Sequence, residues 1–152
     1  MVNFREKMLS FRHLCYKNGY LFAAFLIPVI LMGIAYISFG IYPFGGRSVL
    51  SLDLNAQYVF YFDYVHDVIG NGESLMYSWS RNLSGEFMGI IGYYLASPFN
   101  ILVWIFPRSM ITEGLLTMML AKFGACGVTF ALFAHKSQKL SKTTAVLFAP
   151  MY

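Results

Sequence analysis

Asp53 is the residue of this 152-residue chain that is best suited to chemistry. It stands at the start of a helical pattern, shortly after a long apolar run that ends near Tyr42. A carboxylate held rigidly at that point could act as a general base and take a proton from an acceptor hydroxyl. The simpler alternative is a helix N-cap, in which the same carboxylate accepts backbone N–H groups. The sequence leaves both roles open.

A second candidate, Lys122, lies in the middle of another long apolar run. A charge at bilayer depth costs about 2.5–3.5 kcal/mol, so it usually faces a partner or a polar cavity. Glu113 precedes it by about 13–14 Å along a helix, which is too far for a direct ion pair. Lys122 could therefore contact a phosphate, or pair with a charge on another helix. Three more cations, which could bind a phosphate or simply be solvated, are Arg47, Arg81 and Arg108.

The composition indicates a membrane protein. The chain is 58% hydrophobic and only 12% charged, whereas a soluble domain is about a quarter charged. A net charge of +4 with clustered Lys and Arg suits the anionic inner leaflet better than a nucleic acid. The cysteines, Cys15 and Cys126, predict neither a disulfide framework nor a metal site, and no nucleotide loop or catalytic triad is found. We therefore expect no cofactor, no metal and no nucleic-acid partner.

Two segments, 19–42 and 111–134, are long and apolar enough to cross a hydrocarbon layer of about 30 Å. The first is too long for a secretory signal peptide, so it is predicted to be an uncleaved transmembrane helix. The basic arm 1–18 and the basic loop 135–142 carry seven of the 11 Lys and Arg. The positive-inside rule then places both in the cytoplasm and segment 43–110 outside. Residues 143–152 start a third apolar run, which predicts a chain that ends inside a third transmembrane helix.

The external segment is predicted to contain an amphipathic surface helix at about 52–69, ended by Gly70-Asn71-Gly72. Asp63 and Asp67 are one turn apart, repel mildly, and are expected on its wet face. Residues 73–92 predict a structured loop with at most short helices. Segment 93–107 is short and contains Pro98, which favours a re-entrant or interfacial segment. The apolar face of the helix is formed by Leu54, Tyr58, Tyr61, Phe62, Val65, Val68 and Ile69.

The predicted fold class is therefore an all-α membrane protein. It has two complete transmembrane helices, a long extracytoplasmic loop with a surface helix and a re-entrant or interfacial segment, and the start of a third transmembrane helix. Four sequence elements in this order carry a resemblance to a known family. They are Ser51-Leu-Asp-Leu-Asn-Ala-Gln-Tyr58, Gly72-Glu-Ser-Leu-Met-Tyr-Ser78, Gly85-Glu-Phe-Met-Gly89 and Tyr93-Tyr-Leu-Ala-Ser-Pro-Phe-Asn100.

These elements resemble the N-terminal region of bacterial YfhO-type membrane proteins, which are similar to the GT-C class of glycosyltransferases. The resemblance implies transfer of a sugar from a polyprenyl-phosphate donor to a cell-wall polymer, such as a lipoteichoic acid, at the outer face of the bacterial plasma membrane. It implies Asp53 as the catalytic residue. For such a reaction we expect a set of substrate-binding residues: Lys122, Arg47, Gln57, Tyr58 and Arg81. Relatives contain many more helices, so this chain alone is expected to be inactive.

Two alternatives remain. The chain could be part of a transporter or permease, in which Lys122 and the break near Pro98 line a substrate path. It could also be a small structural membrane protein with only packing roles. The enzyme hypothesis predicts Asp53 in an outward-facing cavity near a cation, whereas the structural hypothesis predicts that Asp53 only caps its helix.

Overall fold

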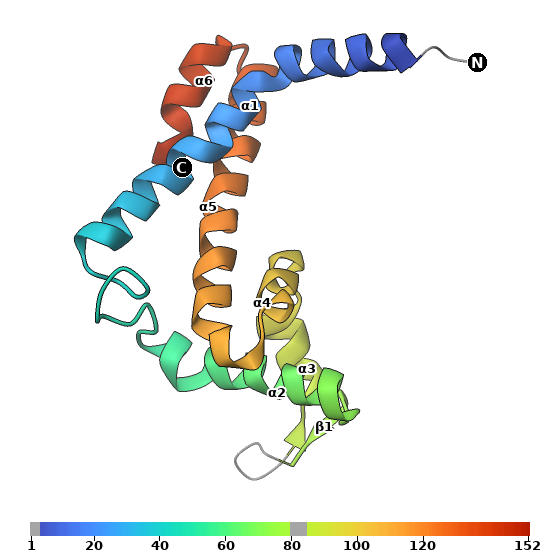
Figure 1. Cartoon of the computed structure of the whole chain (residues 1–152), viewed down its shortest axis with the longest axis vertical. Coiled ribbons are helices and arrows are strands. Elements are labelled where there is room, and N and C mark those ends of the chain that lie inside the picture. Colours follow the sequence, from blue (N-terminus) through green and yellow to red (C-terminus); the bar gives the residue numbers. More distant parts are fainter. Residues whose placement is uncertain (1–3, 80–84) are drawn as a thin grey trace. The chain divides into compact units, whose positions relative to one another are not determined.

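The structure is a computed structural model that describes the backbone of residues 4–79 and 85–152, and side chains from residue 18 onward within those ranges. The described chain is mostly helical (Figure 1). It divides into two compact units. The terminal unit comprises Met1–Ala35 with Leu120–Tyr152, and the central unit comprises Tyr36–Met119. Each unit is described by itself below.

Two helices are long and apolar enough to cross a membrane. In α1 (Phe4–Ser38), the stretch Asn18–Ser38 has a mean hydropathy of 2.4. The second candidate span, Arg108–Lys136, contains α5 (Ile111–Lys136) and has a mean hydropathy of 1.7. At about 1.5 Å per residue, both exceed the roughly 20 residues that a bilayer core requires. The prediction of a mostly helical chain with two transmembrane helices is confirmed.

Small residues form the core of the terminal unit. Ala24 on α1 and Ala131 on α5 are fully buried. Gly127 packs so closely on the backbone of Ala24 that a β-carbon there would overlap its carbonyl oxygen. This is the close helix approach that small residues allow between membrane helices, where backbones make the contacts. Helix α6 (Lys142–Phe148) joins the same core through Ala145 and is capped by Ser141, whose Oγ accepts the N–H of Thr144 at 3.1 Å.

The central unit consists of short elements that turn repeatedly. A π-helical turn, η1 (Leu54–Tyr58), runs into α2 (Val59–Asn71), which Gly72 ends in the left-handed conformation with φ 72°. Strands β1 (Tyr77–Ser78) and β2 (Gly85–Glu86) then pair antiparallel, whereas the sequence predicted only loop and short helices there. The remaining elements are α3 (Met88–Ile90), η2 (Ile91–Leu95), η3 (Pro98–Asn100), α4 (Ile101–Ile105) and η4 (Arg108–Met110).

Helix α2 buries much of its predicted apolar face. Phe62 and Val65 are buried among residues of α4 and α5, and Leu54, Tyr58, Tyr61 and Val68 pack around them. Two positions differ from the prediction: Ile69 is 66% exposed and Tyr64 is 6% exposed. Tyr64 turns inward because its hydroxyl donates to the carbonyls of Ser74, at 2.8 Å, and Tyr77, at 3.1 Å. Ser74 and Tyr77 come after α2 in the sequence, so the hydrophobic periodicity of the helix does not indicate this contact.

The segment before α5 is bent sharply. Its two helical arms, Met88–Leu95 and Pro98–Ile105, meet at 96°. Each arm is about 12 Å long at 1.5 Å per residue. At a right angle the pair therefore reaches about 17 Å, well short of a bilayer core of about 30 Å. Pro98 lies at the bend and cannot continue the preceding helix, because it lacks a backbone N–H. The geometry agrees with a re-entrant or interfacial segment, which stays a prediction.

Candidate active site

Asp53 occupies the N-cap position of η1, but its carboxylate accepts no capping hydrogen bond. Its backbone is already helical, with φ −61° and ψ −28°, whereas a capping residue normally has extended angles. The residue before it, Leu52, has a positive φ of 48°, which is uncommon for any residue other than glycine. Such backbone strain is often found at functional sites. The helix-cap alternative is not supported, and the exposed carboxylate is available to a ligand.

A cluster of tyrosine rings lies around Tyr94. The rings of Tyr58 and Tyr61 contact Tyr94 at centroid distances of 4.9 and 5.4 Å, and Tyr93 contacts Tyr94 at 4.6 Å. Burial raises the pKa of the Tyr94 phenol, and Tyr61, Tyr93, Tyr58 and the charge of Asp53 raise it further. Tyr58, a predicted substrate-binding residue, therefore belongs to this ring cluster, while the site roles of Asp53 and Tyr58 stay predictions.

Two other predicted site residues belong to the central unit but do not bond to Asp53. The backbone of Arg47 is held by two hydrogen bonds, from its N–H to the Gly40 carbonyl at 3.0 Å and from the Tyr42 N–H to its own carbonyl at 2.7 Å. Its side chain and that of Gln57 are exposed. Within the described residues, neither side chain forms a hydrogen bond or an ion pair. Their substrate-binding roles stay predictions.

Lys122 lies in the part of α5 that belongs to the terminal unit, and it is half-buried. Across residues 18–79 and 85–152 it has no ion-pair partner, Glu113 included. Arg81 and the Asn82-Leu83-Ser84 sequence lie outside the described residues. In the part that the structure describes, no three His, Cys, Asp or Glu side chains gather closely enough to hold a metal ion.

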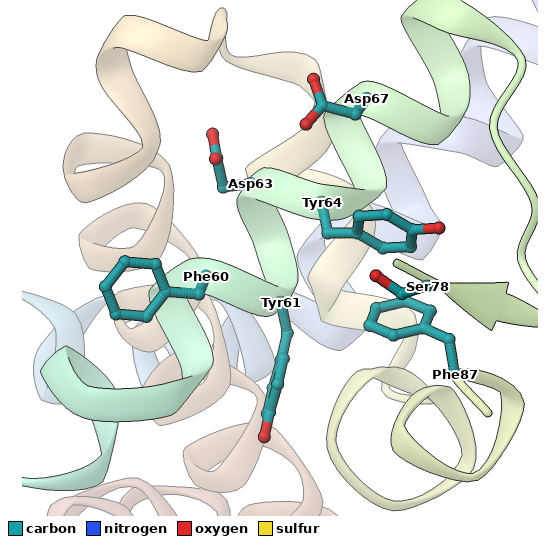
Figure 2. A pocket seen from close by; sticks show the side chains of 7 residues that line it. All are labelled: Phe60, Tyr61, Asp63, Tyr64, Asp67, Ser78 and Phe87. Atoms are coloured by element: carbon teal, nitrogen blue, oxygen red, sulfur yellow. The ribbon is translucent and has the colours of Figure 1, made fainter. Parts of the chain in front are cut away.

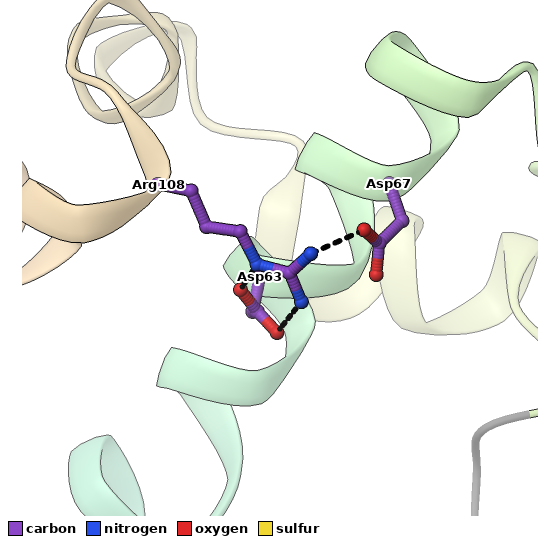
Figure 3. Close-up of polar contacts among 3 residues, drawn as sticks. All are labelled: Asp63, Asp67 and Arg108. Atoms are coloured by element: carbon purple, nitrogen blue, oxygen red, sulfur yellow. Dashed lines mark hydrogen bonds and ion pairs between the residues drawn. The ribbon is translucent and has the colours of Figure 1, made fainter.

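Arg108 joins η4 to α2 through two carboxylates (Figure 3). Its Nε and Nη2 donate to the two oxygens of Asp63, and its Nη1 donates to Oδ1 of Asp67 at 2.5 Å. We call this group the Arg108 clamp. The sequence favoured a solvated Arg108 and a wet helix face for Asp63 and Asp67; the three side chains do stay partly exposed, but the ion pairs between them were not predicted. The available signal was the pair of like charges one helical turn apart, since a cation between them removes their repulsion.

A comparison with protein-family models matches the chain, from residue 23 to residue 152, to a family described as bacterial membrane protein YfhO. The chain belongs to the YfhO family. The resemblance carried by the four sequence elements is thereby confirmed, and so is a membrane location for this family member. No curated protein and no solved structure matches the chain.

This YfhO-family chain also has a pocket beside α2, at the edge of the core, since Tyr64 and Phe87 belong both to the core and to the pocket lining (Figure 2). The pocket has a volume of about 160 Å³. Sequence reasoning missed it because Ser78 and Phe87 come from the β1–β2 region and meet α2 only in the folded unit. Its lining consists of Phe60, Tyr61, Asp63, Tyr64, Asp67, Ser78 and Phe87.

Near the start of α5, Glu113 accepts a hydrogen bond from the Tyr42 hydroxyl at 2.9 Å. This bond, followed by the charge of Glu113 and by burial, raises the pKa of Tyr42. It ties the segment after α1 to α5 within the central unit of the YfhO-family chain. Together with the Arg108 clamp, it fixes the region that precedes the second candidate span.

The Arg108→Gln variant is expected to lower the midpoint of thermal unfolding slightly. The bidentate ion pair stabilises the unit, but the Arg108 side chain is 55% exposed, so solvent screens the pair. Thermal unfolding of the chain in lipid nanodiscs measures the change, and high salt should reduce it. Arg47→Gln is the matched control, because the Arg47 side chain bonds to no described residue. An equal decrease in thermal stability of Arg108→Gln and Arg47→Gln would show that the Arg108 clamp does not stabilise the central unit.

Proposed function

We propose that this chain is the N-terminal part of an integral membrane glycosyltransferase. It acts with a polyprenyl-phosphate sugar as donor and a cell-wall polymer of the teichoic-acid type as acceptor. The reaction takes place at the outer face of the bacterial plasma membrane, with the N-terminus of the chain in the cytoplasm. The observation that carries the proposal is the uncapped, exposed carboxylate of Asp53 in a chain of the YfhO family, outside both candidate spans.

In this mechanism Asp53 is the general base. Its carboxylate takes the proton from an acceptor hydroxyl while the hydroxyl oxygen bonds to the anomeric carbon of the donor sugar. The bond between that carbon and the phosphate oxygen breaks, and the polyprenyl phosphate leaves with the electron pair.

The remaining predicted residues bind substrate. Gln57 and Tyr58 follow Asp53 on η1 and carry groups that can hydrogen-bond to sugar hydroxyls. Arg47 and Arg81 are the cations of the external segment and would bind the donor phosphate, as a guanidinium can do bidentately. Lys122, in the terminal unit, would contact a donor phosphate as a point charge. The proposed activity is that of a full-length family member that contains this segment.

The test is sugar transfer by a purified full-length family member that contains this segment. The protein is reconstituted in vesicles, and a radiolabelled polyprenyl-phosphate N-acetylhexosamine is supplied with a teichoic-acid acceptor on the side of the 43–110 segment. We expect label to pass from the lipid extract to the polymer. Label that stays in the lipid, with the protein folded and both substrates present, would rule out the proposed reaction.

The bent pair Met88–Leu95 and Pro98–Ile105 favours a second function, transport, because broken helices often line substrate paths. The same vesicles distinguish the two functions. A transporter moves a free sugar into the vesicle lumen and leaves its glycosidic linkage intact. A glycosyltransferase forms a new linkage and accumulates no free sugar inside.

A further inference from the structure

The pocket beside the Arg108 clamp is large enough for one six-membered ring. Its volume of about 160 Å³ is close to that of an apolar cavity of about 150 Å³ that accommodates benzene. Three of its walls are the aromatic rings of Tyr61, Tyr64 and Phe87, and Phe60 stands at the rim with 64% of its surface exposed. The ring of Tyr64 is fixed, since its hydroxyl is bonded to two carbonyl groups and its ring contacts Phe87 at 4.5 Å.

Ser78 gives this aromatic pocket a polar group. The residue is 2% exposed, and its hydroxyl forms no hydrogen bond with any residue that the structure describes. Figure 2 shows the hydroxyl oxygen beside the rings of Tyr64 and Phe87, on the side of the pocket that faces α2. The Ser78 hydroxyl oxygen stays accessible, since the fully buried side-chain atoms without a partner in the described residues are Nε2 of His66 and Nε1 of Trp104. A ligand hydroxyl in the pocket would replace solvent as the hydrogen-bond partner of Ser78.

The charges around the pocket select against anions. Arg108 occupies both oxygens of Asp63 and only Oδ1 of Asp67, so Oδ2 of Asp67 is left to accept a hydrogen bond. The two carboxylates and the guanidinium sum to −1, so a phosphate is repelled. A neutral hydroxyl can donate to Oδ2 of Asp67 without placing a second cation beside Arg108, and an apolar ligand face suits the aromatic rings. A small cation is the competing ligand, which the tetramethylammonium measurement below tests.

A pyranose ring has these properties, because its C–H groups form an apolar face and its hydroxyl groups project around the edge. We propose that the pocket binds a single uncharged sugar ring, with hydrogen bonds to Asp67 and Ser78. Tyr61 lines the pocket, and its ring also contacts Tyr94 at a centroid distance of 5.4 Å within the central unit.

We assign the bound ring to a glycosyl substituent of the acceptor. In the donor, the phosphate is bonded to C1 of the sugar and would be held against the carboxylates, whereas the phosphodiester groups of a teichoic-acid acceptor are not bonded to C1 of such a substituent. This assignment to the acceptor rests on the proposed function, whereas the binding of an uncharged sugar ring rests on the pocket alone. The two statements can therefore fail separately.

The experiment measures binding of methyl β-D-glucopyranoside and its 2-acetamido-2-deoxy analogue to the chain by saturation-transfer difference NMR. Nanodiscs are used because glycoside detergents carry sugar rings of their own. We expect saturable binding to the wild-type chain. Ser78→Ala and Asp67→Asn should each weaken binding by about threefold to tenfold, the effect of one lost hydrogen bond. Ser38→Ala, an exposed serine outside the pocket, is the matched control and should bind as the wild type does.

Three results would overturn the inference: no saturable binding of either pyranoside, binding that both pocket variants leave unchanged, or binding of tetramethylammonium in place of the pyranosides. Thermal unfolding of each variant shows whether it is folded, and Asp67→Asn provides a second test that leaves the Asp63 pair intact. Pyranoside binding together with absent sugar transfer by the full-length protein would refute the proposed function and the acceptor assignment, but not the sugar site.

Discussion

The Asp53→Asn variant of a full-length YfhO-family protein is expected to transfer sugar about 10²–10⁴-fold more slowly than the wild type. Asparagine keeps the size of the side chain but cannot take the proton of the acceptor hydroxyl. The loss should appear in kcat, since the carboxylate acts on the proton that moves in the transition state. The measurement is the initial rate of label transfer from the polyprenyl-phosphate donor at saturating acceptor.

The matched control is Glu73→Gln, which removes an exposed carboxylate that follows α2 in the same unit. Its rate should stay within about twofold of the wild type, as for most surface substitutions. Asp53→Ala separates catalysis from capping, because loss of a true N-cap costs about 1 kcal/mol. We expect an unchanged unfolding midpoint, since Asp53 makes no capping bond. Full activity in Asp53→Asn would remove this residue from the mechanism.

The features that the sequence predicted correctly are those that depend on neighbouring residues. A stretch such as Asn18–Ser38 can be recognised by length and hydropathy, because the bilayer requires about 20 apolar residues in succession. The end of α2 at Gly72 follows from the ability of glycine to adopt a positive φ. The family was visible in short elements whose order agrees with the match over residues 23–152.

The features that the sequence missed depend on residues far apart in the chain. Arg108 reaches Asp63 and Asp67 across separations of 45 and 41 residues, and no local pattern encodes that meeting. The burial of Ser78 likewise requires the two-residue strands to pair and carry it against α2. Hydrophobic periodicity reports which face of a helix is apolar, but not which distant segment will cover it.

In the candidate site, too, the sequence predicted what depends on neighbouring residues and missed what depends on the fold. The spacing of the helical pattern placed Asp53 at the start of a helix, yet its missing cap follows from backbone angles that only the fold specifies. Tyr58 was predicted as a substrate-binding residue, and the structure adds Tyr94 as its ring partner. The substrate-binding roles of Arg47, Arg81 and Lys122 stay predictions. A phosphate site is formed by several chain segments together, and the sequence alone does not show which segments meet.

Gly127→Ala is expected to lower the free energy of unfolding by about 1–3 kcal/mol, as overpacking of a core does. The added β-carbon would overlap the carbonyl oxygen of Ala24 and lie 2.9 Å from Cγ of Pro28. A carbonyl of a helix backbone cannot rotate away as a side chain can, so α1 and α5 would have to separate within the terminal unit. They would lose contacts around Ala24 and Ala131, both fully buried. Thermal unfolding in nanodiscs gives the change.

Gly33→Ala is the matched control, since Gly33 is also a glycine inside a candidate span of the terminal unit. A β-carbon at Gly33 has no atom within 4 Å, so it meets open space. Alanine favours a helix over glycine by about 1 kcal/mol in water, which predicts an unchanged or slightly higher stability for this variant. A lower stability of Gly127→Ala together with an unchanged or higher stability of Gly33→Ala would attribute the loss to the packing of α1 against α5. Equal destabilisation by both would contradict a close approach of α1 and α5 at Gly127 and attribute the loss to a general intolerance of larger residues in the spans.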